Sequence, residues 1–167
     1  MKLIDTSCLI LFLEFLQEYA FLITFSEIGE VMIITPQVEK EYNSKNVQSD
    51  NINYNLTKLI DNDIIIKEDC EIFDLFKNKY FYLGKGEQSI LSLGLKYKAQ
   101  NKKYFCVLDD KKARKVASEM GLHIKGSIGL LHILKRKGLI EKPKEVIEKI
   151  RNSPFRVSDD ILEGLDA

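Results

Sequence analysis

Short apolar runs alternate with amphipathic stretches along this chain, and the alternation predicts a succession of strands and helices. Four runs have the composition and length of buried strands, and a shorter run is expected to form a fifth; the runs span residues 2–5, 31–35, 63–67, 104–108 and 123–125. The stretches between them carry apolar residues at helical spacing. This order favours an α/β fold with a central, mostly parallel sheet of four or five strands and helices on both faces.

Proline, glycine and helical spacing place the expected helices. Pro36 is expected to open one helix, and Gly121 and Gly138 are expected to end two others. Ser7 is expected to cap the first helix through its hydroxyl. Helices are expected over residues 8–25 (one helix or a pair), 56–60, 70–80, 111–120 and 128–137. The helix that begins at Pro36 carries Glu41, a further helix follows Gly84 and Gly86, and two short helices are expected from residue 142 onward. Residues 43–55 are expected to form a loop or helix joint.

The length of 167 residues is that of one domain with a core of its own. We therefore expect a single domain over residues 1–167, with its core in 1–140 and a helical extension in 141–167 packed on that core.

The net charge and the distribution of charged residues exclude few classes of function. The formal net charge is zero, so no overall basic field indicates a nucleic-acid partner. Lysine and arginine nevertheless crowd the region between residues 96 and 115. Such runs are usually solvated helix faces, although a basic rim around an acidic centre also suits an enzyme that cuts a polyanion.

The cysteines and the apolar N-terminal stretch indicate a cytoplasmic protein. Three cysteines without paired spacing are expected to be reduced and buried. Residues 8–25 are apolar enough to suggest a membrane span, but Glu14, Gln17 and Glu18 interrupt them, so we expect no membrane segment. Their excess of Leu and Phe is expected to serve a subunit interface.

Four separate stretches place carboxylates where a strand or turn leads into a helix: Asp5, Glu41, Glu87 and the pair Asp109 and Asp110. Ligands of open α/β sheets bind beyond the carboxyl ends of the strands, so we expect these side chains to meet in one pocket. Two negative charges about 5 Å apart repel by roughly 3 kcal/mol at an effective dielectric near 20. A cation or raised pKa values must therefore accompany such a cluster. Oxygen ligands without Cys or His select Mg²⁺ or Mn²⁺ rather than zinc.

Each carboxylate also has an ordinary structural explanation. Asp110 is a plain N-cap candidate for the helix that follows it, and Glu87 suits the first turn of its helix. Asp5 and Asp109 are harder to explain in this way, because each follows an apolar strand where an unpaired charge is costly.

These motifs resemble those of the PIN-domain nucleases, in the subgroup related to VapC toxins. The likeness runs nearly the whole length of the chain in the expected order. The matching pieces are LIDTS at 3–7, TPQV at 35–38 with Glu41, GKGE at 84–87, LDDKKAR at 108–114, KGSIGLL at 125–131 with GLI at 138–140, and SPFRVSD at 153–159.

The resemblance implies a PIN-like three-layer α/β/α sandwich and metal-dependent cleavage of RNA, with Mg²⁺ or Mn²⁺ as the cofactor. It assigns catalysis to the acidic set, with the metal held by Asp5, Glu87 and the Asp pair. Glu39 competes with Glu41 for the second acidic position. Either member of the Asp pair can face the metal while the other caps the next helix.

The resemblance also concerns the substrate and the partners. Ser7 matches a hydroxyl that assists the site, and we expect Lys111, Lys112 and Arg114 to hold flanking phosphates of the RNA. A role as the toxin of a toxin–antitoxin pair, a cognate antitoxin and a homodimer are expected on the same ground.

Other function classes compete with this interpretation. A PIN-fold module with a degenerate site would bind RNA or protein without cleaving it. A small-molecule phosphatase of the haloacid type would begin with Asp-x-Asp, whereas Thr6 and Ser7 follow Asp5. A nucleotide-binding loop is disfavoured because residues 84–86 lack the P-loop spacing and a strand directly before them.

Overall fold

A computed structural model of the protein describes residues 1–17, 19–45 and 56–166. At its centre lies a five-stranded sheet in the order β3-β2-β1-β4-β5, in which every neighbouring pair is parallel. The strands are β1 (Lys2–Ile4), β2 (Met32–Ile34), β3 (Ile65–Lys67), β4 (Phe105–Val107) and β5 (Ile124–Lys125). The five strands expected from the apolar runs are confirmed.

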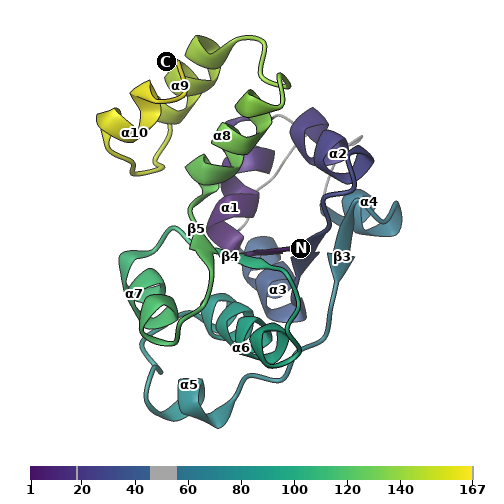
Figure 1. Ribbon diagram of the computed structural model, residues 1–167, viewed down its shortest axis with the longest axis vertical. Helices are drawn as coiled ribbons and strands as arrows, with labels where there is room; N and C mark the ends of the chain where they lie inside the picture. Colours follow the sequence, from purple (N-terminus) through teal and green to yellow (C-terminus); the bar gives the residue numbers. More distant parts are fainter. Residues whose placement is uncertain (18, 46–55, 167) are drawn as a thin grey trace.

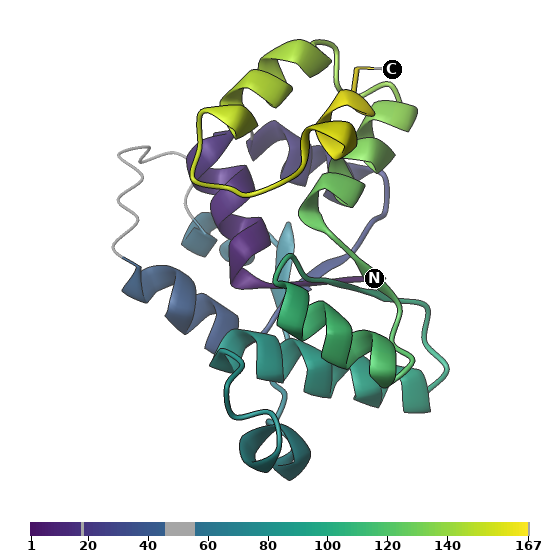
Figure 2. The same cartoon turned by 90° about the vertical axis from the view of Figure 1, so that its left-hand side faces the viewer.

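Helices cover both faces of the sheet, which confirms the three-layer sandwich. Figure 1 and the perpendicular view in Figure 2 show α1 and α8 on one side and α6 and α7 on the other. The helices are α1 (Thr6–Ile10), the π-helix η1 (Leu11–Phe15), α2 (Tyr19–Glu27), α3 (Pro36–Ser44), α4 (Leu56–Asp61), α5 (Asp74–Asn78), α6 (Lys85–Ala99), α7 (Lys111–Glu119), α8 (Ser127–Arg136), α9 (Pro143–Arg151) and α10 (Asp159–Glu163).

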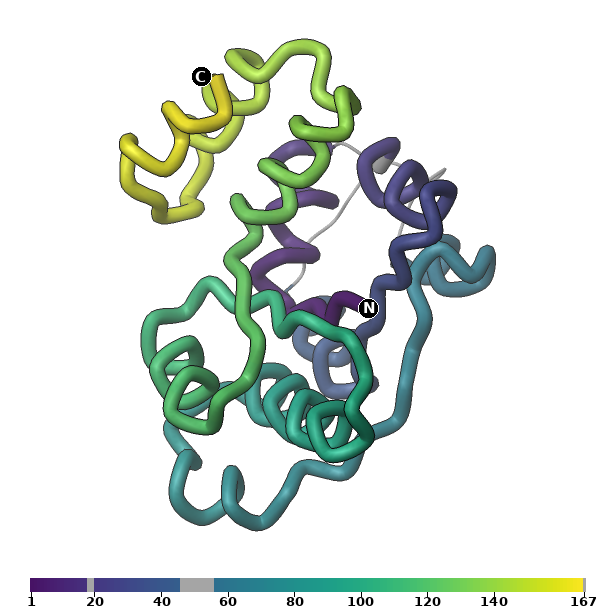
Figure 3. Tube along the Cα trace, viewed as in Figure 1, coloured from purple at the N-terminus to yellow at the C-terminus, as the bar shows by residue number. Residues whose placement is uncertain are grey.

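The order of the strands creates a switch point beside the central strand. The chain runs from β1 outward through β2 to β3, and then returns through α5 and α6 to form β4 on the other side of β1; the tube in Figure 3 traces this return. Ile4 of β1 lies opposite Val107 of β4, so the residues that follow these two strands emerge next to one another. Open α/β sheets bind ligands at such a point.

The core packs tightly where α6 crosses the sheet. Leu3, Val107 and Leu93 are fully buried. A methyl group placed on Gly94 of α6 would lie only 2.7 Å from the sulfur of Cys106 in β4. Glycine at this position therefore lets the helix approach the strand more closely than any other residue would allow.

Most expected helix boundaries are confirmed, and two expectations are wrong. The helix expected over 70–80 is limited to α5, because the backbone of Phe73 is extended and its N–H donates to Ser92 Oγ (3.1 Å) instead of joining a helix. Ser7 does not cap the first helix, because that helix begins at Thr6 and contains Ser7. Gly121 and Gly138 do follow helices, with φ angles of +64° and +72°.

The apolar N-terminal stretch forms α1, η1 and α2, and it belongs to the core of this chain. Its Leu11, Phe12 and Phe25 are fully buried. These side chains are therefore not available to the subunit interface that their composition suggested, and the homodimer stays a prediction.

In the part of the chain that the structure describes, no helix has the length and apolar character needed to cross a membrane. Residues 46–55, most of the expected loop, lie outside the described residues.

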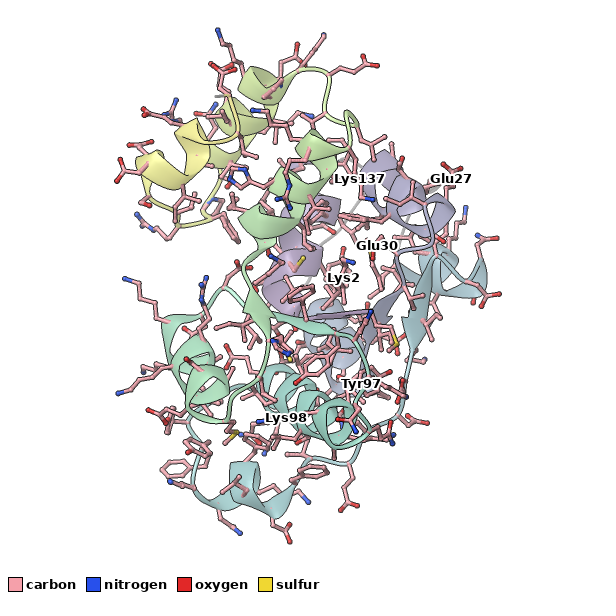
Figure 4. All side chains as sticks on the ribbon, viewed as in Figure 1. Lys2, Glu27, Glu30, Tyr97, Lys98 and Lys137 are labelled. Carbon is pink, nitrogen blue, oxygen red and sulfur yellow. The ribbon has the colours of Figure 1, made fainter. Side chains whose placement is uncertain are left out.

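A partly buried ion pair lies at the amino-terminal edge of the sheet, opposite the switch point. Lys2, at the start of β1, is only 4% exposed and pairs with Glu30. Figure 4 shows the two side chains next to one another. The Lys2 ammonium also lies 5.9 Å from the centre of the Phe25 ring. Pairing with Lys2 lowers the pKa of Glu30, so Glu30 is charged at neutral pH.

Candidate functional site

Asp5 is the buried centre of the site. It directly follows β1, and its N–H donates to the carbonyl of Val107 in β4 (3.3 Å). The side chain is 4% exposed, and its Oδ1 accepts no hydrogen bond from any residue that the structure describes. Burial raises the pKa of Asp5 to about 7, and the negative charges of Glu87, Glu41 and Asp109 act in the same direction. A buried carboxylate oxygen of this kind would suit a cation or a proton.

Asp109 faces Asp5 across the hydroxyl of Ser7. Ser7 Oγ lies 3.3 Å from Asp5 Oδ2 and 3.2 Å from Asp109 Oδ2. On its other side, Asp109 Oδ1 accepts the N–H of Ser127 (2.8 Å), and Oδ2 accepts the Ser127 hydroxyl. The two carboxylates are thus held on either side of one hydroxyl group, although they are 104 residues apart in the chain.

Glu41 reaches the site from α3. Its Oε1 accepts the N–H of Gly86 (2.8 Å) at the start of α6, and its Oε2 accepts the hydroxyl of Thr6 (2.9 Å) at the start of α1. Glu39, the competing residue, instead pairs with Lys67 at 2.9 Å. The structure therefore brings Glu41 and not Glu39 toward the other acids.

Glu87 at the start of α6 and Asp110 at the start of α7 complete the set. Glu87 accepts the N–H of Gly84 (2.9 Å), and its pKa is raised by burial and by the charges of Asp110 and Glu41. Asp110 Oδ1 caps α7 by accepting the N–H groups of Lys112 (2.8 Å) and Ala113 (3.0 Å). Within the Asp pair, Asp110 is thus the helix cap and Asp109 is the residue that faces Asp5.

We call Asp5, Glu41, Glu87, Asp109 and Asp110 the acidic cluster. Their carboxylates lie at the N-termini of α1, α6, α7 and α8, and Glu41 reaches this position from the second half of α3. The N–H groups at helix starts and the helix dipoles favour negative charge there. These donors lower the cost of gathering the carboxylates. The carboxylates can therefore satisfy helix starts and still leave Asp5 Oδ1 without a donor from the residues that the structure describes.

The donor atoms are of the type that binds a hard divalent cation, but their present positions do not form a coordination site. Within residues 1–17, 19–45 and 56–166, no three Asp, Glu, His or Cys side chains converge closely enough to hold one ion as they stand. Carboxylate and hydroxyl oxygens without nitrogen or sulfur suit Mg²⁺ or Mn²⁺. The observation that fits such an ion is the buried Asp5 oxygen, which has no donor in the described part of the chain and lies near the charge of Asp109.

The expected phosphate-binding side chains lie at the start of α7. Lys111, Lys112 and Arg114 are all exposed. Arg114 extends toward α8, with its Nη1 only 3.1 Å from the position that a methyl group on Gly126 would take. Their exposure and their place next to Asp109 and Asp110 make them accessible to a charged ligand of the acidic cluster.

Three residues that hold the acids were not assigned any role from the sequence. They are Thr6, which donates to Glu41, Gly86, whose N–H also donates to Glu41, and Ser127, which holds Asp109. Gly86 and Ser127 lie inside the motifs at 84–87 and 125–131. The sequence does contain a signal for Gly86 and Ser127. Each follows a glycine N-cap, Gly84 or Gly126, that has no side chain to satisfy the first N–H groups of the helix, so a distant acid must accept them.

A family model described as a PIN domain matches residues 1–165 of the chain. No curated protein and no solved structure matches the chain.

Proposed function

The chain belongs to the PIN-domain family, whose members are generally nucleases, and from this premise we propose that it is a metal-dependent ribonuclease. The reaction is hydrolysis of a phosphodiester bond in RNA at the acidic cluster, with Mg²⁺ or Mn²⁺ as the cofactor. One observation carries the proposal: the buried Oδ1 of Asp5 at the switch point has no donor among the described residues, while three other carboxylates raise the pKa of Asp5.

In this proposal Asp5 and Asp109 are the central metal ligands, and Glu87 and Asp110 lie beside them. When bound, the ion lowers the pKa of its water and neutralises charge on the phosphate. Ser7 keeps Asp5 and Asp109 at a fixed spacing through its hydroxyl. Glu41, anchored by Gly86 and Thr6, adds negative charge at the wall of the site. The cationic side chains of α7 hold the flanking phosphates.

The test is cleavage of total RNA with Mn²⁺ or Mg²⁺ by the wild-type protein and by Asp5→Asn. The variant keeps the shape of the side chain and removes its charge, so we expect cleavage to fall at least about a hundredfold while the protein stays folded. Asp61→Asn is the matched control, because Asp61 is exposed at the end of α4. Full cleavage by Asp5→Asn would contradict the role of Asp5.

A second measurement follows the ion without any cleavage. Mn²⁺ at about a hundred times its dissociation constant should raise the free energy of unfolding by about 2.7 kcal/mol, since it binds only the folded state. Thermal unfolding with and without Mn²⁺ should show this gain for the wild type and for Asp61→Asn, but not for Asp5→Asn. If Mn²⁺ raised the free energy of unfolding equally in all three proteins, the ion would bind at a site that does not include the charge of Asp5.

A binding module is the second candidate, and one observation favours it. Each of Glu41, Glu87, Asp109 and Asp110 already accepts a hydrogen bond from a protein donor. A degenerate site would therefore bind RNA or a protein partner and yield no metal-dependent products. The cleavage assay separates the two candidates.

The ribonuclease proposal also includes a toxin role, a cognate antitoxin, a homodimer and a cytoplasmic location. Growth arrest on expression would test the toxin role, and co-purification with the product of a neighbouring gene would test the antitoxin.

A further inference from the structure

A groove with a volume of about 1020 Å³ lies beside the acidic cluster. One wall is formed by residues of α7 and α8, and the other by residues 150–162, which include the segment that links α9 to α10. In Figure 1 this linking segment and α7 both lie at the left of the molecule, and Figure 2 views the molecule from that side. Asp109 lines the groove as well, so the groove is continuous with the acidic cluster.

Cationic side chains line this groove. Arg151 is neutralised by Asp159, 3.1 Å away. The remaining cations are Lys111, Arg114 and Arg156, which are exposed and which make no ion pair with any residue in the described part of the chain. Three unpaired cations next to a phosphodiester-cleaving site favour a polyanion as the occupant.

Apolar side chains also line the groove, together with His132 and polar residues, and Phe155 supplies a phenyl ring. Its ring is half-buried and packs against the core. The N–H of Phe155 donates to Ser153 Oγ (3.1 Å), and that hydroxyl donates to the carbonyl of Ile150 (2.7 Å), so the backbone that carries the ring is fixed. An aromatic ring beside cations is the arrangement that binds unpaired bases and their phosphates.

A second cavity offers a contrast in charge. It has a volume of about 550 Å³ and is lined by Glu14, Glu145 and Glu148, with Lys149 as its one lysine among the described residues. Three carboxylates repel phosphate, so this cavity does not suit RNA. The difference in charge assigns the polyanion to the groove beside Asp109.

We propose that this groove binds single-stranded RNA next to the bond that is cut, with Arg156 and Arg114 holding phosphates and Phe155 contacting a base. The inference rests on the proposed function, because it gives the RNA substrate a path to Asp109. It also gives a role to the motif at 153–159, which the acidic cluster does not use.

The test measures RNA binding in the absence of cleavage. Full-length protein carrying Asp5→Asn is titrated into a fluorescein-labelled single-stranded RNA of about eight nucleotides, and the anisotropy is recorded. Adding Arg156→Ala should remove one phosphate contact. The slope of log K against log salt should then fall by about 0.7, which corresponds to about fivefold weaker binding near 0.1 M salt. Arg136→Ala is the matched control, because Arg136 is exposed at the end of α8 and does not line the groove.

Three outcomes would overturn the proposal: unchanged binding by the Arg156→Ala protein, an equal loss with Arg136→Ala, or equally tight binding of poly-glutamate, which would identify an acidic peptide site.

A duplex RNA of the same length should bind more weakly, because its bases are not available to Phe155. The readout does not require cleavage. A wild-type protein that cleaves no RNA would contradict the nuclease proposal alone, whereas cleavage with unchanged binding by Arg156→Ala would contradict the groove alone.

Discussion

Ser127 donates both its backbone N–H and its hydroxyl to the carboxylate of Asp109. The residue at the N-cap of α8 is Gly126, which has no side chain to satisfy the first N–H groups of the helix. Asp109, which directly precedes the cap of α7, takes over that task from a neighbouring part of the sheet. The start of α8 and the orientation of an acid in the cluster therefore depend on one another.

Ser127→Ala should reduce activity more than stability. The variant keeps the N–H bond to Asp109 and loses the hydroxyl bond, so the free energy of unfolding should fall by about 1 kcal/mol. The freed carboxylate can turn away from Ser7, and cleavage should fall at least about tenfold because small misplacements of catalytic groups are costly. Urea unfolding and a cleavage assay measure the two effects. Ser118→Ala, on the exposed face of α7, should change neither; full cleavage by Ser127→Ala would contradict the positioning role.

The stability of the metal-free protein should fall as the pH rises from about 4 to about 7. Burial raises the pKa of Asp5 from its ordinary value of 3.8 to about 7 in the folded state. In this range the folded protein keeps a proton that the unfolded chain has lost, so stability decreases with pH. The stabilisation is complete below about pH 4, and its loss is of the order of 4 kcal/mol. Urea unfolding in EDTA at several pH values measures it.

Asp5→Asn provides the control for this pH dependence. Asparagine does not titrate, so the contribution of Asp5 should disappear and the stability of the variant should vary less between pH 4 and 7. An identical pH profile for the wild type and the variant would show that Asp5 does not keep its proton in the folded state.

Gly86→Ala should disturb the acidic cluster without changing any carboxylate. A methyl group at this position would lie 2.6 Å from Glu41 Oε2 and 3.1 Å from Thr6 Oγ1, so the end of the Glu41 side chain must move. We expect a folded protein with cleavage lowered at least about tenfold. Gly129→Ala in α8 is a control for stability, because its methyl group meets nothing closer than 3.5 Å and alanine favours the helix by roughly 0.5–1 kcal/mol. Wild-type cleavage by Gly86→Ala would show that the position of Glu41 is not critical.

Glu30→Gln should destabilise the protein although it lies at the opposite edge of the sheet from the acidic cluster. The substitution leaves the buried Lys2 ammonium without its carboxylate partner. Because the Glu30 side chain is 29% exposed, we expect a loss of about 2 kcal/mol, below the range for fully buried pairs. Thermal unfolding measures the loss, and Glu27→Gln, an exposed neighbour, is the matched control. A restored stability in the double variant Lys2→Met with Glu30→Gln would attribute the effect to the unpaired lysine.

The local features of the chain were predictable because they depend on neighbouring residues. The apolar runs gave all five strands, and Gly121 and Gly138 end helices at positive φ as expected. Asp110 is a helix cap for reasons contained in the residues that follow it. The expectation for Ser7 failed by two positions, because the N-cap is Asp5 and helix starts are set by contacts that spacing alone does not define.

The sequence by itself determined the parallel α/β arrangement and the set of acids that follow its strands and turns, because periodicity and strand ends are properties of short segments. Only the tertiary structure decided that Glu41 rather than Glu39 joins the cluster, that Asp109 rather than Asp110 faces Asp5, and that Ser127 holds Asp109. These choices depend on the crossover that brings β4 beside β1 and on hydrogen bonds between residues tens of positions apart. Such contacts form only when distant segments pack together, and no local pattern records them.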